Sequence, residues 1–198
     1  MGSAAEKIVQ LRPLNIQRMK LKIIGTSPYM PEPVDMSVAE YYNKKKSLQS
    51  VDKDTRSEEE KAKEKFYYTE DGKYGMPVRA LYRSGEKGSK YVLSRSDGGM
   101  KKFAEAVNVL GDIVELHYER LEIDKRTGRP QGQSKSPRLI IRNKFINWWV
   151  EIEVEFNASA ISAEQVVNIF ECAGFHIGVG GFRKECKGNF GLFKVAKD

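Results

Sequence analysis

The residues best placed to do chemistry lie in the last quarter of the chain, where glycines are interspersed with basic side chains. Glycine lets a backbone approach a ligand closely, and successive N–H groups with nearby cations attract anions. The predicted loop therefore suits a phosphate ligand, although the turns of a surface hairpin would also need such glycines. Its candidate binding residues are Gly178, Gly180, Gly181, Arg183, Lys184, Lys187, Gly188 and Gly191.

The loop does not match the phosphate-binding motifs of nucleotide-hydrolysing or dinucleotide-binding enzymes. A Walker loop needs Gly-Lys followed by Ser or Thr, and no such triplet follows here. A dinucleotide loop must open a helix, whereas this loop follows one and precedes a short apolar segment. Nucleotide hydrolysis is therefore not expected.

A second basic segment lies in the middle of the chain. Residues 124–137 contain no apolar side chain, so they are expected to project as a flexible loop or hairpin tip. Such a loop could lie along a phosphate backbone and release counterions without contacting bases. The alternative is a solvated loop with no ligand. The candidate binding residues here are Lys125, Arg126, Arg129, Lys135, Arg138 and Arg142, and no acidic residue lies between Lys125 and Lys144, the last basic residue of the segment.

Aromatic and acidic residues limit how a nucleic acid could bind. Tyr67, Tyr68, Phe182 and Phe190 could stack on bases, but aromatic residues at strand edges also fill cores. The predicted strand over 148–156 places glutamates on one face, where they would repel a phosphate backbone. We therefore expect binding by loops and a flank of the molecule rather than by the centre of a sheet.

Two histidines offer an enzymatic alternative. His117 and His176 could form a general acid–base pair for RNA cleavage, but ordinary structural histidines have the same pattern. No nucleophile with an adjacent base and no ligand-spaced metal cluster is evident, and Cys172 and Cys186 are expected to be free thiols. The expectation is a non-enzymatic protein with no catalytic residue, metal or cofactor.

Three regular elements are well signalled. Ser162 and Gln165 have capping-box spacing, and an apolar stripe predicts a helix from there to Gly174. Alternation predicts strands over residues 19–23 and 148–156.

Other elements are less certain. Met100, Phe103, Val107 and Leu110 predict another helix that stops at Gly111. A strand from Val114 is expected to continue through a bulge near residues 119–120, and residues 139–141 fit a returning strand. Residues 74–82 are ambiguous.

These elements predict an α+β fold in one domain over residues 1–198, with a charged flexible insertion at about 31–65 and a basic loop at about 124–138. A ferredoxin-like two-layer sandwich, with an antiparallel sheet covered on one face by two helices, satisfies the apolar stripes. The net charge of +7 favours an anionic partner. No apolar run is long enough to span a membrane and the N-terminus lacks a signal-peptide core, so a cytoplasmic location is expected.

Three segments carry a family resemblance: residues 21–28 (LKIIGTSP), residues 71–77 (DGKYGMP) and the stretch from Gly174 to Val195. Together they resemble small bacteriophage-encoded proteins of uncertain role. The C-terminal helix, glycine loop and strand also resemble the glycine-rich loop region of the repeat-associated (RAMP) proteins of CRISPR systems. That resemblance implies a ferredoxin-like core holding RNA against the loop, and by residue it covers Gly178, Gly180, Gly181, Arg183, Gly188 and Gly191. Glu185 interrupts the basic loop and departs from the pattern.

Together these observations predict a protein that binds single-stranded nucleic acid, DNA or RNA, through its backbone, and that could assemble side by side along the strand. The alternative is a phage protein that binds a host defence ribonucleoprotein complex. A ribonuclease using His117 or His176 is a third alternative.

Overall fold

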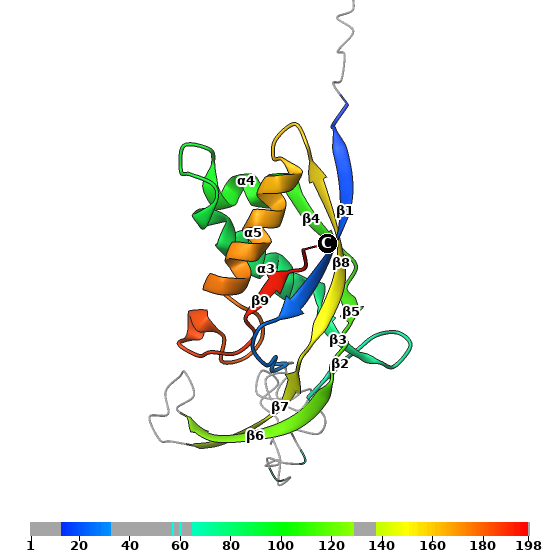
Figure 1. The fold of residues 1–198 in the computed structure, drawn as a ribbon, viewed down its shortest axis with the longest axis vertical. Helices are drawn as coiled ribbons and strands as arrows, with labels where there is room; N and C mark the ends of the chain where they lie inside the picture. Colours follow the sequence, from blue (N-terminus) through cyan, green and yellow to red (C-terminus); the bar gives the residue numbers. More distant parts are fainter. Residues whose placement is uncertain (1–12, 33–56, 58–59, 61–64, 129–137, 198) are drawn as a thin grey trace, which may run out of the picture.

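A computed structural model describes residues 13–32, 57, 60, 65–128 and 138–197. Its main layer is a sheet with the strand order β4-β8-β1-β9, made of β4 (Val107–Leu110), β8 (Trp149–Asn157), β1 (Ile16–Gly25) and β9 (Phe193–Val195). All three pairings are antiparallel. The helices α3 (Val78–Gly88), α4 (Gly99–Ala106) and α5 (Ala163–His176) lie on one side of this sheet (Figure 1). The molecule is therefore α+β, as the sequence predicts.

The core lies between the sheet and the helices, because alternation along the central strands turns one row of apolar side chains inward. Val150, Ile152, Val154 and Phe156 of β8 are buried, as are Leu21 and Ile23 of β1. The opposite face carries charges that pair across the strands: Arg18 contacts Glu155 at 2.8 Å, and Lys20 and Lys22 are registered with Glu153 and Glu151. Both predicted strands and their two faces are confirmed.

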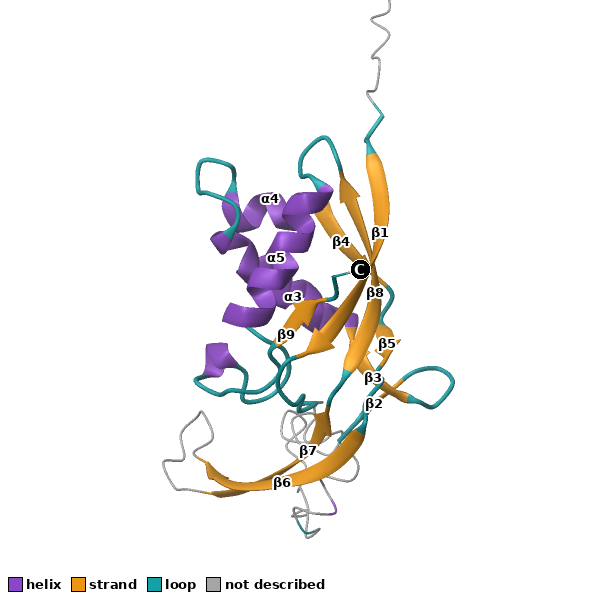
Figure 2. Ribbon diagram, in the orientation of Figure 1, coloured by secondary structure: helices purple, strands orange, loops and turns teal. Residues whose placement is uncertain are grey.

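Two smaller sheets extend from this core. The strands β2 (Tyr67–Tyr68), β3 (Tyr74–Pro77) and β5 (Ile113–Glu115) form one, and β6 (Arg120–Gly128) with β7 (Arg138–Ile146) forms a long antiparallel ribbon. Figure 2 shows this ribbon curving away from the main sheet and passing below the helical layer. Most of the predicted 31–65 insertion and the ribbon tip, residues 129–137, lie outside the described residues.

The structure corrects the helix predicted to stop at Gly111. The helix ends at Ala106, and Val107 begins β4, in which Val107 and Val109 are buried and Asn108 is exposed. This segment pairs with β8. The spacing of four residues between Phe103 and Val107 is compatible with a continued helix or with a strand. Pairing with the distant strand β8 decides in favour of the strand.

Three further expectations are wrong. Gly174 lies inside α5 rather than at its end, since the helix continues to His176. The proposed bulge near residues 119–120 is instead a break between β5 and β6, where His117 makes an isolated bridge to Trp149. The prediction of a loop or hairpin tip at 124–138 begins it too early, because residues up to Gly128 belong to β6, which pairs with β7.

Two short 3-10 turns complete the described structure: η1 (Ser89–Tyr91) follows α3, and η2 (Lys184–Cys186) lies in the glycine-rich loop. No helix in the described part of the chain is long and apolar enough to cross a membrane.

Candidate functional site

The structure brings the two basic segments of the sequence together. The guanidinium of Arg126, on β6, lies 4.6 Å from the ring centre of Phe190 and 5.0 Å from that of Phe182. The guanidinium of Arg142, on β7, lies 4.7 Å from the Phe182 ring. Arginine over an aromatic face gains electrostatic attraction and buries apolar surface. The ribbon is therefore packed against the glycine-rich loop, and both belong to one surface.

Acidic partners hold both arginines. Arg126 makes a two-point contact with Asp124, with Nη2 donating to Oδ2 at 2.6 Å, and this contact lowers the pKa of the Asp124 carboxyl. Arg142 Nη2 lies 2.8 Å from Glu32 Oε1. Of the four aromatic residues that could have stacked on bases, Phe182 and Phe190 are thus covered by arginines. Arg126 and Arg142 present a braced cationic surface, and Phe182 and Phe190 support it.

The glycines of the loop are required by its own close packing. Gly178 and Gly180 both have φ of +76°, a left-handed conformation that other residues rarely adopt. A Cβ at Gly181 would overlap the Arg142 guanidinium, and at Gly188 or Gly191 it would overlap backbone atoms of the same loop. The turns of the loop itself therefore explain much of the glycine pattern. Gly181 has a further role, because the absence of a side chain there lets Arg142 of the ribbon approach the loop closely.

The basic side chains of the loop have different surroundings. Arg183 donates from Nε and Nη2 to Glu185 at 3.0 and 2.9 Å, and from Nη1 to the Gly180 carbonyl at 3.1 Å. Lys184 donates to the Phe175 carbonyl at 3.0 Å, whereas Lys187 is exposed at the end of η2 with φ of +62°. Arg183 is thus fixed within the loop, and Lys187 faces solvent.

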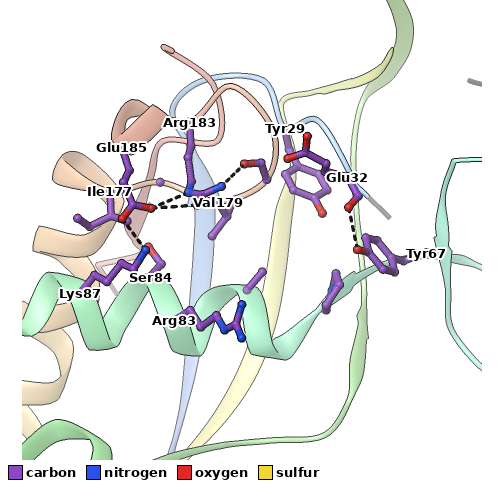
Figure 3. Close-up of a pocket in the computed structure, with 14 residues that line it drawn as sticks. Tyr29, Glu32, Tyr67, Arg83, Ser84, Lys87, Ile177, Val179, Arg183 and Glu185 are labelled. Carbon is purple, nitrogen blue, oxygen red and sulfur yellow. Dashed lines mark hydrogen bonds and ion pairs between the residues drawn. The ribbon is translucent and has the colours of Figure 1, made fainter. Parts of the chain in front are cut away.

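A cavity of about 260 Å³ lies between α3 and the glycine-rich loop (Figure 3). Arg83 and Lys87 reach it from α3, and Arg183 reaches it from the loop. Glu185 joins the two walls, because Lys87 Nζ lies 2.5 Å from its Oε1 while Arg183 contacts its Oε2. These contacts lower the pKa of the Glu185 carboxyl, Lys87 more than Arg183.

Two tyrosines line the same cavity. Burial raises the pKa of the Tyr29 hydroxyl strongly and that of Tyr67 less. Tyr67 donates a long hydrogen bond of 3.3 Å to the backbone carbonyl of Glu32. Both hydroxyls therefore stay protonated near neutral pH, and the cavity combines cations with neutral aromatic groups.

The remaining predicted site residues lie in different parts of the ribbon or outside the described residues. Lys125 is exposed on the ribbon face opposite Arg126, because side chains alternate along a strand. The backbone of Arg138 pairs with Gly128. Arg129 and Lys135 lie outside the described residues.

Sequence reasoning missed the contribution of α3. The cavity residues Ala80, Arg83, Ser84 and Lys87 recur at spacings of three and four, which is one helical face. This face could have been found from that spacing, but Gly85 and Gly88 within the same segment obscure the helix signal. A Cβ at Gly88 would overlap Ala173, and one at Gly85 would lie only 3.0 Å from Phe103 and 3.2 Å from Phe170, so both positions favour glycine.

The two histidines do not share a site with the cavity. His117 stacks on Trp149 with ring centres 3.7 Å apart, and His176 stacks on Tyr91 at 4.0 Å. Neither lines the cavity. Among the described residues, no group of three or more His, Cys, Asp or Glu side chains is placed to hold a metal ion, and Cys172 and Cys186 are free.

Comparison with known proteins gives a likeness in structure but none in sequence. No family model and no curated protein matches the chain. Among solved structures, the chain is similar to the crystal structure of Cmr6 from Pyrococcus furiosus, with a TM-score of 0.47 and 12% sequence identity. The match covers 93% of this chain and 100% of that one.

Proposed function

We propose that this protein binds single-stranded nucleic acid through the phosphate backbone, using the β6–β7 ribbon and the glycine-rich loop as one surface. Support comes from the contact between the two basic segments, in which Arg126 and Arg142 lie on Phe182 and Phe190. Separate basic loops are common on soluble proteins. Here the ribbon and the loop contact each other, so that together they form an extended cationic surface suited to a polyanion.

The charge distribution supports the same surface. Residues 120–146 contain eight basic and two acidic side chains, a net charge of +6 out of +7 for the whole chain. The charge is thus concentrated in the ribbon and its tip, whereas the open face of the main sheet carries paired charges such as Arg18 with Glu155. A strand held by its phosphates would follow the ribbon and avoid the glutamates of the sheet.

The finer fold assignment belongs to this proposal. The core elements β1, α3, β4, β8, α5 and β9 follow one another along the chain, and the sheet order is β4-β8-β1-β9. That order supports a ferredoxin-like, RAMP-like core into which the ribbon and the small three-stranded sheet are inserted. The phage origin, assembly along a strand and the absence of enzymatic activity remain predictions.

The proposal is tested by fluorescence anisotropy with labelled single-stranded RNA, single-stranded DNA and duplex DNA across a salt series. We expect salt-sensitive binding to a single-stranded form, weaker as salt rises. Lys187→Gln, which removes the solvent-facing lysine of the glycine-rich loop, should weaken binding to all sequences and reduce the slope of log K against log salt by about 0.7 for a single strand.

The matched control is Lys101→Gln, which removes one exposed lysine from α4, outside the proposed surface. Equal losses for both variants would show that overall charge, not the proposed surface, drives binding. Absence of binding to all three ligands at low salt would reject the proposal, and the partner would then have to be a protein complex.

A further inference from the structure

The cavity between α3 and the glycine-rich loop has one wall made by a single face of the helix. Ala80 and Ser84 are small and leave space, whereas Arg83 and Lys87, one turn apart, carry cations to the cavity. Figure 3 shows Arg83, Ser84 and Lys87 on the helix, with Arg183 and Glu185 on the loop opposite. Lys87 and Glu185, on the two walls, are 98 residues apart in sequence, so the cavity depends on the tertiary fold.

The cavity has an excess of positive charge. Lys87 and Arg183 share one carboxylate, that of Glu185. Arg83 has no ion-pair partner within the described part of the chain, and Glu32, the other acid in the lining, pairs with Arg142 of the ribbon. An anion entering the cavity would therefore meet three cations and two carboxylates, one shared by Lys87 and Arg183 and the other paired with an arginine outside the lining, which leaves one net positive charge.

A buried hydroxyl in the same wall has no hydrogen-bond partner among the described groups. Ser84 is 3% exposed, and its Oγ makes no hydrogen bond to any described group. Buried polar atoms nearly always have a partner, so an orphaned hydroxyl in the wall of a cationic cavity points to a bound acceptor. Ser84 is a second observation, independent of the charges, that indicates a ligand.

We propose that this cavity binds a phosphate monoester of a nucleotide, with its oxygens at Arg83, Lys87 and the Ser84 hydroxyl. The inference rests on the proposed function and specifies which part of a nucleic acid enters the fold. At roughly 30 Å³ for each water, 260 Å³ holds about eight waters, so there is room for a sugar beside the phosphate. Tyr67, at the other end of the lining, offers an aromatic surface for the base.

A monoester fits better than a backbone diester on charge. A phosphate monoester carries nearly two negative charges and three strong acceptor oxygens near neutral pH, whereas a diester carries one charge. Three cations that line one cavity, with a hydroxyl donor, match the former. The same chemistry is offered by the 5′-terminal nucleotide of a strand and by a free nucleoside monophosphate.

The two sources are separated by two measurements on the wild-type protein. In the first, oligonucleotides of one sequence with a 5′-phosphate or a 5′-hydroxyl compete for binding. In the second, adenosine monophosphate and inorganic phosphate are titrated by calorimetry. A roughly tenfold preference for the 5′-phosphate identifies the strand terminus, since one charge-assisted contact has about this effect. Binding of the free nucleotide without that preference identifies the free ligand.

The variants test which residues carry the binding. Arg83→Ala should abolish the preference or the nucleotide titration, and Ser84→Ala should reduce it several-fold. Arg79→Ala is the matched control, because Arg79 is also exposed on α3 but does not line the cavity. Ser84→Ala should leave the melting temperature of the free protein unchanged or higher, since its hydroxyl has no partner to lose.

Failure of this inference differs from failure of the proposed function. If both oligonucleotides bind equally and neither nucleotide nor phosphate binds, the cavity inference is overturned while the ribbon surface stands. Loss of the preference in Arg79→Ala to the same degree as in Arg83→Ala would also overturn it. If neither oligonucleotide binds at low salt, the proposed function fails, and the calorimetric titration still tests the cavity alone.

Discussion

At the scale of single residues, Glu185 has the most consequential position. Its carboxylate joins Lys87 of α3 to Arg183 of the loop, and it does so within the cavity where an anion is proposed to bind. The residue that breaks the basic pattern of the loop therefore has two effects. It ties the loop to the helix, and it competes with any anion for two of the three cations.

The Glu185→Gln variant should separate these effects. Lys87 and then Arg183 lower the pKa of this carboxyl in the folded protein, so its stabilisation is present above the unfolded-state pKa and is lost as pH falls through the lowered value. At pH 7 the variant should lose about 1 kcal/mol or less of unfolding free energy, because the pair is partly exposed. Thermal denaturation should show this difference shrinking towards zero in acid, while calorimetry at pH 7 shows tighter binding of adenosine monophosphate.

Glu105→Gln is the control for this change. Glu105 makes an exposed pair with Lys101 on α4 at 3.6 Å, outside the cavity. The Glu105→Gln variant should leave the affinity for adenosine monophosphate unchanged. Weaker nucleotide binding in Glu185→Gln would instead mean that the carboxylate orients the cations rather than competing with the ligand.

At the scale of elements, α5 shows how a glycine can serve packing in the interior of a helix. Gly174 lies two residues before the helix end at His176, where a Cβ would overlap the carbonyl of Phe193 in β9. The contact brings the helix close to the edge strand of the main sheet, and the glycine-rich loop connects these two elements. The site therefore depends on this packing as well as on its own residues.

Gly174→Ala should destabilise the protein by about 2–3 kcal/mol, because backbone atoms cannot move aside as a side chain can. The expected fall in melting temperature is roughly 5–10 °C. Gly72→Ala is the comparison, since Gly72 has φ of +77° but a Cβ there meets no atom within 4 Å. It should cost only about 1 kcal/mol of backbone strain. Equal losses would contradict the packing argument.

The elements also show what could be predicted from the sequence. The cap formed by Ser162 and Gln165 and the alternation of β8 are local signals, and both are confirmed. β4 and α3 were not predicted, because their structures depend on distant partners. β4 pairs with β8, and the glycines of α3 pack against α5. The sequence supplied the basic residues of the site, but the contact of Arg126 with Phe190 and the α3 wall of the cavity arise from tertiary packing.

At the scale of the whole molecule, the segment that carries most of the net positive charge is not part of the main sheet. The compact core has a sheet face of paired charges, and the excess positive charge is carried by a ribbon that curves away from it (Figure 1). Loss of the end of such a ribbon should alter binding far more than folding, because β6 and β7 pair with each other and not with the main sheet.

Replacing residues 126–140 by Asn-Gly tests this separation, since Lys125 and Ile141 are paired and a two-residue turn can join paired antiparallel strands. The change removes Arg126, Arg129, Lys135 and Arg138 and lowers the net charge from +7 to +3. The melting temperature should fall by only a few degrees, whereas the slope of log K against log salt should drop by as much as about 3, at roughly 0.7 for each phosphate that is no longer neutralised. A full-length variant with glutamine at the same four positions should show the same drop in slope, because the effect is electrostatic. If the shortened protein keeps the wild-type slope, the backbone of the nucleic acid does not follow the ribbon.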